Sequence, residues 1–392
     1  MLRKKMLAVI NEVNSEVVER EELIECIALA LLTRKNLFNL GETGQAKSYT
    51  INKFREHITG AQQFERLLTK MTDEESLFGR IDLNSYIAGN PRMITTGKIP
   101  DCHICFLDEI FKCNDGTLNS LLTALNEHRY TNEGETVDIW VISFFSASNE
   151  IPDFNDPFEK ILRPLYDRFE LKVVTQYIQN RDNRLRMLAH KQRQAGSQIT
   201  ATITLEELYA AQHEVASVIV PEAINELMDD ILCELRRLGI HVSDRKFLNY
   251  YPIAQAKAWL SGRDIVEPSD LTVLKCYFWT KVEEITIIQQ VLERFCVNPL
   301  EDRLKEIALL ASESYDEFTS NVDAKSTKAL IKLRGEFIRL YNILEQLRTD
   351  GFDNNGKIAV DSAIENLEKM SKTAHEKCNF TYAPLSELAK LQ

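Results

Sequence analysis

A run of residues that begins at Gly41 has the types and spacing that a phosphate-binding loop requires. It reads Gly41-Glu42-Thr43-Gly44-Gln45-Ala46-Lys47-Ser48 and lies between an expected strand and an expected helix. A triphosphate needs backbone N–H groups turned inward, a lysine at its β- and γ-oxygens and a hydroxyl on Mg²⁺. We therefore predict that this run and the following Tyr49 bind a nucleotide. Because Ala46 replaces the usual glycine, an ordinary glycine-bearing turn is the alternative.

Two adjacent carboxylates, Asp108 and Glu109, follow the apolar run Ile104-Cys105-Phe106-Leu107. Such a run is typical of a parallel strand that is buried on both faces. Burying two acids for stability alone is costly, so we expect them at the exposed carboxyl edge of the sheet. There one carboxylate can hold the Mg²⁺ shell, and the other can polarise a water aimed at the γ-phosphate. Capping of the next helix is the alternative.

Three later polar residues can complete such a site. Asn149 ends the next apolar run, where an amide can orient the attacking water, although a turn asparagine is also common. Arg168 ends the segment Leu165-Tyr166-Asp167-Arg168, and Arg245 ends Ser243-Asp244-Arg245. By themselves these arginines indicate little, because a lone arginine is usually part of a weak surface ion pair.

Alternating strands and helices are needed to position these residues. Strands are expected at 36–40, 65–68, 102–107, 140–147 and 169–174, and helices at 22–33, from 47 onward and at 118–125. This alternation predicts an α/β fold, a parallel sheet with helices on both faces. Residues 79–98 contain several glycines, fit the alternation poorly and are interpreted as an insertion that projects from the sheet.

The pattern becomes helical after about position 176. It runs across 180–280 with breaks near Gly239 and Gly262, and it recurs at 301–311, 326–348 and 360–372, with a turn signal at 351–356. The chain is therefore divided into an α/β core at 1–178, a helical lid at 179–281 and a helical C-terminal extension at 282–392.

Composition and charge restrict the class of protein. The chain is 44% hydrophobic and 27% charged, which is typical of a globular protein, and its net charge of -12 disfavours nucleic acid as a partner. No apolar run approaches the length of a membrane span, and the N-terminus lacks a cleavage signal, so a cytoplasmic protein is expected. Cys102 and Cys105 form a single CxxC without a second half and are interpreted as packed thiols.

Several of these segments occur in one order and together resemble a MoxR-type AAA+ ATPase. They are Gly-x-x-Gly-x-Ala-Lys-Ser, Phe-Leu-Asp-Glu-Ile-Phe-Lys, Asn-Ser-Leu-Leu-Thr-Ala-Leu-Asn-Glu, Ala-Ser-Asn-Glu-Ile-Pro, Leu-Tyr-Asp-Arg and Ser-Asp-Arg. The last two, with Met-Thr-Asp-Glu-Glu-Ser-Leu-Phe-Gly at 71–79, are most similar to the RavA branch. The resemblance covers about residues 8–290 and does not extend to the tail.

The resemblance implies a role for each residue of the site. The roles are the Walker A lysine and magnesium-binding hydroxyl at Lys47 and Ser48, the Walker B metal ligand at Asp108, the catalytic base at Glu109, sensor 1 at Asn149, an arginine finger for the neighbouring subunit at Arg168 and sensor 2 at Arg245. Two positions depart from the family pattern. Glu42 introduces an anion beside the phosphate loop, and His128 stands where relatives have an arginine.

The implied activity is ATP hydrolysis with Mg²⁺ by a homo-hexameric ring that acts as a chaperone, remodelling or maturing a client protein. A partner with a von Willebrand factor A (vWA) domain is typical of the family. Two alternatives are kept. One is a nucleic-acid-directed AAA+ motor, for which the insertion offers little positive charge; the other is a nucleotide-binding scaffold with little turnover, against which the intact Lys47, Asp108 and Glu109 argue.

Overall fold

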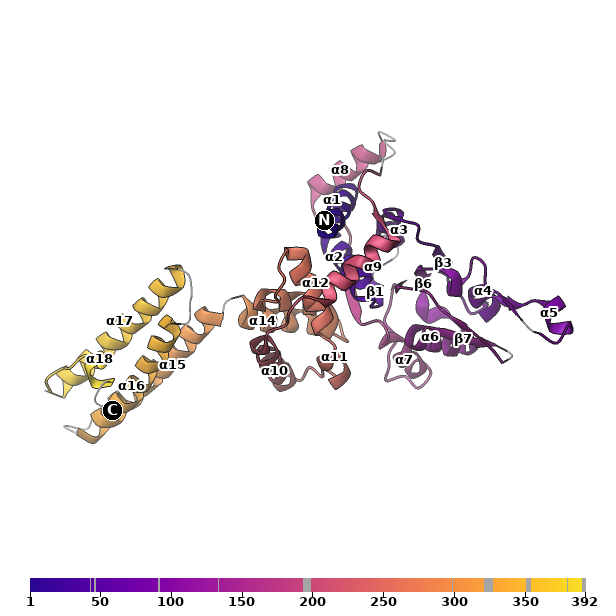
Figure 1. The fold of residues 1–392 in the computed structure, drawn as a ribbon. Coiled ribbons are helices and arrows are strands. Elements are labelled where there is room, and N and C mark those ends of the chain that lie inside the picture. The colour runs from indigo at the N-terminus through magenta and orange to yellow at the C-terminus, as the bar shows by residue number, and fades with distance from the viewer. Residues whose placement is uncertain are drawn as a thin grey trace. The chain divides into compact units, whose positions relative to one another are not determined.

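The computed structural model describes residues 1–392 except 43, 46, 91, 133, 193–198, 298, 321–326, 350–353, 379 and 390–392. The chain divides into two compact units, Met1–Leu292 and Glu293–Gln392 (Figure 1). Among the described residues, no helix combines the length and the apolar character needed to cross a membrane. The three domain boundaries expected from the sequence stay predictions.

The first unit is built on a five-stranded parallel sheet with the strand order β10-β1-β9-β6-β3. The strands are β1 (Leu37–Leu40), β3 (Gln63–Leu67), β6 (Ile104–Asp108), β9 (Ser143–Ser148) and β10 (Leu171–Val174). β9 is buried along its whole length, and β1 and β6 are buried up to their last residue, as expected for strands covered on both faces. The α/β fold class is confirmed, although β9 begins at Ser143 and leaves Trp140 exposed.

The register of the sheet aligns the carboxyl ends of its strands. Leu40, the last residue of β1, pairs with both Ser148 of β9 and Val174 of β10, and Asp108 of β6 pairs with Ala147. The residues that follow β1, β6 and β9 therefore emerge at one edge, which is where parallel α/β sheets bind ligands.

Helices pack on this sheet and make the core. They include α1 (Leu2–Glu16), α2 (Glu21–Thr33), α3 (Lys47–Glu56), α6 (Asp115–Glu127) and α7 (Arg163–Tyr166). The middle helix α2 is buried from Leu23 to Leu32 except for Glu25, because it contacts β1 and β10 on one side and α1 and α3 on others. Such burial explains why its sequence is apolar nearly all round.

The segment that carries α5 (Leu83–Ile87) extends away from the sheet (Figure 1), while its interpretation as an insertion stays a prediction. Residues 79–98 form the short antiparallel pair β4 (Arg80–Ile81) and β5 (Met93–Ile94), with α5 between them. The sequence did not indicate a second hairpin, β7 (Arg129–Asn132) and β8 (Glu135–Asp138), which follows α6.

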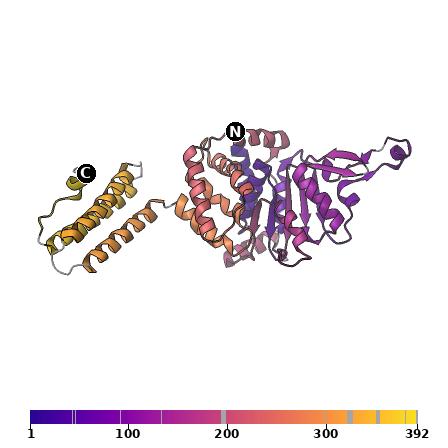
Figure 2. The ribbon, with the colours of Figure 1, turned by 90° about the horizontal axis from the view of Figure 1, so that it is seen from below.

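The rest of the first unit is mainly helical, and Figure 2 shows it beside the strands of the core. It contains α8 (Arg181–Gln192), α9 (Leu205–Ala216), α10 (Glu222–Arg237), α11 (Asp244–Leu248), α12 (Tyr251–Ser261), α13 (Lys275–Phe278) and α14 (Glu284–Cys296). The expectation of helix throughout 180–280 was wrong at β11 (Ile203–Thr204), which pairs in parallel with β2 (Ile58–Thr59). This pairing is too short to leave an alternating pattern in the sequence.

The second unit has a helical core of its own. Its helices are α15 (Pro299–Ser320), α16 (Thr327–Thr349), α17 (Asn354–Lys377) and the short α18 (Leu385–Leu388). They pack through apolar side chains such as Phe337, Leu344 and Val360. The turn expected at 351–356 lies partly outside the described residues, and its last residue, Gly356, is already in α17.

Candidate functional site

The loop between β1 and α3 is so closely packed at Gly41 that a Cβ there would overlap the side chains of Thr175 and Gln45. The Gly41 N–H donates to Ser148 O at 3.1 Å, and a Cβ on Gly41 would lie 2.2 Å from Thr175 Oγ1. Gly44 has φ +86°, a conformation that glycine adopts without strain. Two of the predicted loop residues, Thr43 and Ala46, lie outside the described residues.

Lys47 is the first residue of α3, and its ammonium group reaches the carboxyl edge of the sheet. Nζ donates to Gly41 O and, at 3.1 Å, to Ser148 O. The side chain is 9% exposed, and burial lowers its pKa, while Asp108 and Glu109 act in the opposite direction. The carbonyl groups of two strand ends thus hold a cation at the base of the phosphate loop.

Ser48 and Asp108 converge from two different elements. Ser48 Oγ, in the first turn of α3, donates to Asp108 Oδ2 at the end of β6 with a distance of 3.4 Å. Burial raises the pKa of Asp108, and a hydrogen bond from the Glu109 N–H to Asp108 Oδ1 at 3.0 Å opposes that shift. A hydroxyl and a carboxylate at this separation are suitable ligands for Mg²⁺, so the residues fit the metal that the sequence implies.

Glu109 adopts an unusual backbone conformation directly after β6. Its φ of 54° lies in the left-handed region, which costs a residue with a Cβ about 1 kcal/mol or more. Its Oε2 forms an ion pair with Lys112 Nζ at 3.1 Å. Lys112 is the last residue of the short helical turn Ile110–Lys112, which follows Glu109. The carboxylate therefore has a cationic partner next to the end of β6.

A cleft of about 870 Å³ opens beside these residues. Leu40, Gly41 and Gln45 line it from the phosphate loop, and Asn149 lines it from the end of β9. The helical part of the unit closes it with the segment Thr280–Glu283. A cleft of this size between a phosphate loop and a helical region is large enough to hold a nucleotide.

The structure does not bring all predicted residues to the cleft. Gly41, Glu42, Gln45 and Asn149 line it, and so does Arg163, which the sequence did not suggest. The other predicted residues that the structure describes are not among its lining residues; they are Gly44, Lys47, Ser48, Tyr49, Asp108, Glu109, Arg168 and Arg245. The Arg168 side chain is half-buried, and its Nε has no hydrogen-bond partner among the described residues. Arg245 is exposed on α11.

Glu42 and His128, the two departures from the family pattern, have structural explanations. Glu42 is exposed and accepts a hydrogen bond from Tyr177, which raises the pKa of that phenol. Its charge is therefore directed to the mouth of the cleft. His128 ends α6 in a left-handed conformation, with φ 52°.

Sequence reasoning missed Arg20, which is buried below the phosphate loop. Its Nη2 donates to Gln45 O at 2.9 Å and to Gln176 O at 2.8 Å, so it joins the loop to the segment after β10. Burial lowers its pKa. The position of an arginine just before a helix does not indicate that it will bind two distant carbonyl groups. The sequence of residues 280–283 likewise did not indicate that they line the cleft.

The helical region is attached to the sheet through β10. Trp279 Nε1 donates to Lys172 O at 3.1 Å, and the Tyr166 hydroxyl donates to Thr280 O at 2.8 Å. Lys172 of β10 is buried beside these contacts, and Lys246 of α11 is half-buried there. The segment 279–283, which closes the cleft, is thus fixed directly to the last strand.

Comparison with known proteins decides the family. Residues 4–214, more than half of the chain, match the MoxR domain in the MoxR-vWA-beta-propeller ternary systems. The chain belongs to the MoxR family. Residues 222–292 of this MoxR protein match the AAA lid domain, which agrees with the helices that close the cleft.

Two relatives from Methanocaldococcus jannaschii are similar over most of this MoxR chain. The uncharacterized protein MJ0079 is 30% identical over 89% of this chain and 93% of its own length. The uncharacterized protein MJ0812 is 30% identical over 86% of this chain and 87% of its own length. A crystal structure of an ATPase candidate from Cytophaga hutchinsonii has the same fold, with TM-score 0.61, 18% identity and coverage of 76% of this chain and 95% of that one.

Proposed function

We propose that this chain is an ATPase that hydrolyses ATP with Mg²⁺ in the cleft described above. The observation that carries the proposal is the convergence of Lys47, Ser48 and Asp108 at the carboxyl edge of the sheet. Membership of the MoxR family and of the AAA lid family supports it. Bound Mg²⁺ would supply the positive charge that offsets the phosphate oxygens.

Each residue of the chain has a distinct task in this proposal. Lys47 releases its carbonyl partners and binds phosphate oxygens, while Ser48 and Asp108 hold the metal through oxygen atoms. Glu109 leaves Lys112 and accepts a proton from the attacking water, which Asn149 orients with its amide. The cleft, closed by residues 280–283, limits the access of other water molecules.

We further propose that the active form is a hexameric ring. The match to the MoxR family supports a ring, in which Arg168 would complete the site of a neighbouring subunit. Arg245 lies in the lid, and a lid movement would be needed to bring it to the γ-phosphate. The segments around Arg168 and Arg245 also support the narrower assignment to the RavA branch.

The work done by hydrolysis is proposed to be chaperone-like remodelling or maturation of a client protein in the cytoplasm. The description of the matched family, the MoxR domain of systems that also contain a vWA protein, supports a vWA protein as partner. The exposed apolar residues of the insertion, Leu83, Tyr86 and Ile87, provide a surface that suits contact with protein.

Glu109→Gln tests the ATPase proposal. We expect ATP binding close to wild type, because Lys47 and the metal ligands are retained, and turnover lowered by at least about 10²-fold, because the water loses its base. Equilibrium binding of ATP and steady-state phosphate release measure the two quantities. Glu150→Gln, an exposed acid at the same cleft, is the matched control and should keep its turnover. Wild-type protein without measurable turnover would instead indicate a nucleotide-binding scaffold.

A further inference from the structure

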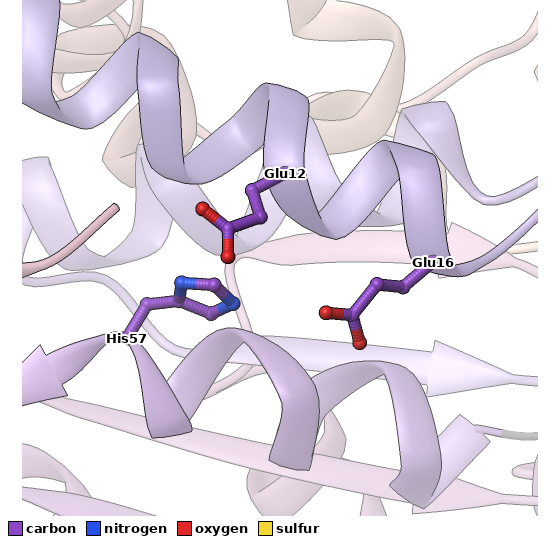
Figure 3. A group of neighbouring side chains, drawn as sticks. All are labelled: Glu12, Glu16 and His57. Atoms are coloured by element: carbon purple, nitrogen blue, oxygen red, sulfur yellow. The ribbon is translucent and has the colours of Figure 1, made fainter. Parts of the chain in front are cut away.

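A second group of chemically suitable side chains lies away from the nucleotide cleft. Glu12 and Glu16 are one turn apart on α1, and His57 follows the end of α3; Figure 3 shows the three side chains directed toward one another. One ligand atom from each residue lies within 4.8 Å of the other two. None of the three belongs to the proposed ATPase machinery.

His57 presents an unprotonated nitrogen to this group. Its Nδ1 lies 2.7 Å from Ala201 O, and since a carbonyl only accepts, Nδ1 carries the proton. In the neutral imidazole Nε2 then has a free lone pair. It has no hydrogen-bond partner among the described residues, although the side chain is 0% exposed. A hydrogen bond from the second ring nitrogen to a carbonyl is the usual support of a metal-binding histidine.

The two carboxylates bring more negative charge than their surroundings neutralise. Glu16 is 5% exposed, and its Oε2 accepts no hydrogen bond from the described part of the chain, although Lys53 Nζ is 3.6 Å away. Glu12 is fixed by hydrogen bonds from Thr200 and Ala201 at 2.7–2.8 Å. Among the described residues, Lys53 is the ammonium group paired with Glu16, and it lies closer to Glu56, at 2.9 Å. The negative charge of Glu12 and Glu16 is therefore incompletely offset and can attract a further cation.

We propose that Glu12, Glu16 and His57 bind a divalent transition-metal cation of the Zn²⁺ class. An imidazole nitrogen with two carboxylates is a ligand set for Zn²⁺ and similar ions, whereas Ca²⁺ and Mg²⁺ prefer oxygen alone. Tetrahedral ligands about 2.0–2.2 Å from the ion are about 3.4 Å apart, so binding would draw the three side chains slightly inward. A water molecule can take the fourth position.

The cation would connect segments that are distant in the sequence. α1 supplies both carboxylates, the end of α3 supplies the imidazole, and the strand pair β2–β11 begins next to His57 and Ala201. The ion would thus hold the far end of the helix whose first residues, Lys47 and Ser48, contact Ser148 and Asp108 at the carboxyl edge of the sheet. Its role is structural and does not depend on the proposed ATPase activity.

The test is metal binding by the intact, nucleotide-free protein. Zn²⁺ titration by calorimetry should show one site per chain, and Zn²⁺ should raise the unfolding temperature. His57→Asn retains a donor for Ala201 O but removes Nε2, and Glu16→Gln removes one charge without changing shape. Both should weaken Zn²⁺ binding by at least about 10-fold. The same substitutions at exposed positions, His213→Asn and Glu206→Gln, should leave affinity unchanged.

Three further measurements separate this site from other metal sites in the chain. Co²⁺ in place of Zn²⁺ should give the absorption of a nitrogen–oxygen site without thiolate charge-transfer bands. Binding should persist in Asp108→Asn, which removes the expected Mg²⁺ ligand. Lys53→Gln should strengthen binding, because the competing ammonium is lost. The proposal is overturned if the wild type binds no stoichiometric cation, if thiolate bands account for the binding, if Asp108→Asn abolishes it, or if His57→Asn and Glu16→Gln bind like the wild type.

Discussion

Arg168 lies after α7 with its guanidinium half-buried and outside the cleft of its own chain. If it serves the neighbouring subunit, Arg168→Ala should bind ATP but lose turnover, by roughly 10³–10⁵-fold for an arginine that offsets charge on the transferring phosphoryl group. Lys47→Ala should lose turnover because phosphate binding is lost. Mixing the two inactive variants should restore activity, because some interfaces then combine an intact Lys47 with an intact Arg168 from the adjacent chain.

Phosphate release at several mixing ratios, after subunit exchange has been verified with labelled chains, measures this rescue. Arg163→Ala is a useful comparison, since Arg163 lines the cleft of its own chain and has an exposed side chain. Mixing Arg163→Ala with Lys47→Ala shows whether Arg163 acts across the interface. A flat baseline for the Arg168→Ala mixture, with exchange verified, would rule out Arg168 as a finger in trans.

The sequence was sufficient to predict residues whose chemistry is tied to a strand end. Lys47, Ser48, Asp108 and Asn149 lie together because each follows or faces the carboxyl end of a parallel strand. Arg20 was not predictable in this way, since its partners are backbone carbonyls supplied by distant segments. Every residue has a backbone carbonyl, so the sequence does not show which carbonyl groups will accept a hydrogen bond from an arginine.

At the scale of elements, β10 and α11 bring two lysines together, Lys172, which is buried, and Lys246, which is half-buried. Lys172 Nζ lies 4.5 Å from the centroid of the Tyr166 ring, and Lys246 Nζ donates to Phe278 O at 3.3 Å. Burial lowers the pKa of Lys172 well below its ordinary value and that of Lys246 to about 8. Nearby acids offset only part of this cost; they are Asp167, Glu170 and Glu284.

Lys246→Met should therefore stabilise the protein, and most of all below pH 8. The pKa of Lys246 is about 8 in the folded protein and about 10.4 in the unfolded chain, so between these pH values unfolding takes up a proton. The free energy of unfolding of the wild type therefore rises with pH in this range, by at most about 1.4 kcal/mol per pH unit from this group. Below pH 8 the lysine is charged in both states, and the folded state bears the full cost of burial. The difference in free energy of unfolding between Lys246→Met and the wild type should be constant below pH 8 and become smaller toward pH 10.

Urea unfolding of both proteins between about pH 7 and pH 10 measures the difference. The exposed Lys4→Met is the matched control and should show no pH-dependent difference from the wild type. If Lys246→Met unfolds with the same excess free energy over the wild type at every pH in this range, Lys246 does not lose its proton in the folded protein between pH 7 and pH 10, and the prediction is wrong.

Strands that are buried on both faces were easier to predict than partly exposed ones. The apolar runs of β1, β6 and β9 are explained by burial on both faces, and that signal is available from sequence. The hairpin β7–β8 alternates between exposed and more buried residues over only four positions per strand, and β11 has two residues. Patterns of that length do not distinguish a strand from a loop.

At the scale of the whole molecule, the C-terminal unit should be dispensable for nucleotide binding. Its helices share a separate apolar core, and none of the residues that line the cleft belongs to it. A chain that stops after Cys296, the end of α14, should bind ATP with wild-type affinity but bind the proposed vWA partner or client less well. ATP titration and co-sedimentation with the partner measure the two effects. Loss of ATP binding by a truncated chain that retains its folded core would contradict this division.

The strand order of the sheet also has a consequence for how the protein is made. β1 is synthesised early, but the strands that pair with it, β9 and β10, are synthesised much later. The backbone of Leu37 can form its sheet pairs only after Phe145 and Leu171 have been made. Contacts between such distant residues make folding slow, and an apolar strand without partners is prone to aggregation in the meantime. Synthesis of the nascent chain through Val174 is therefore the step during which we expect this protein to depend most on cellular folding factors.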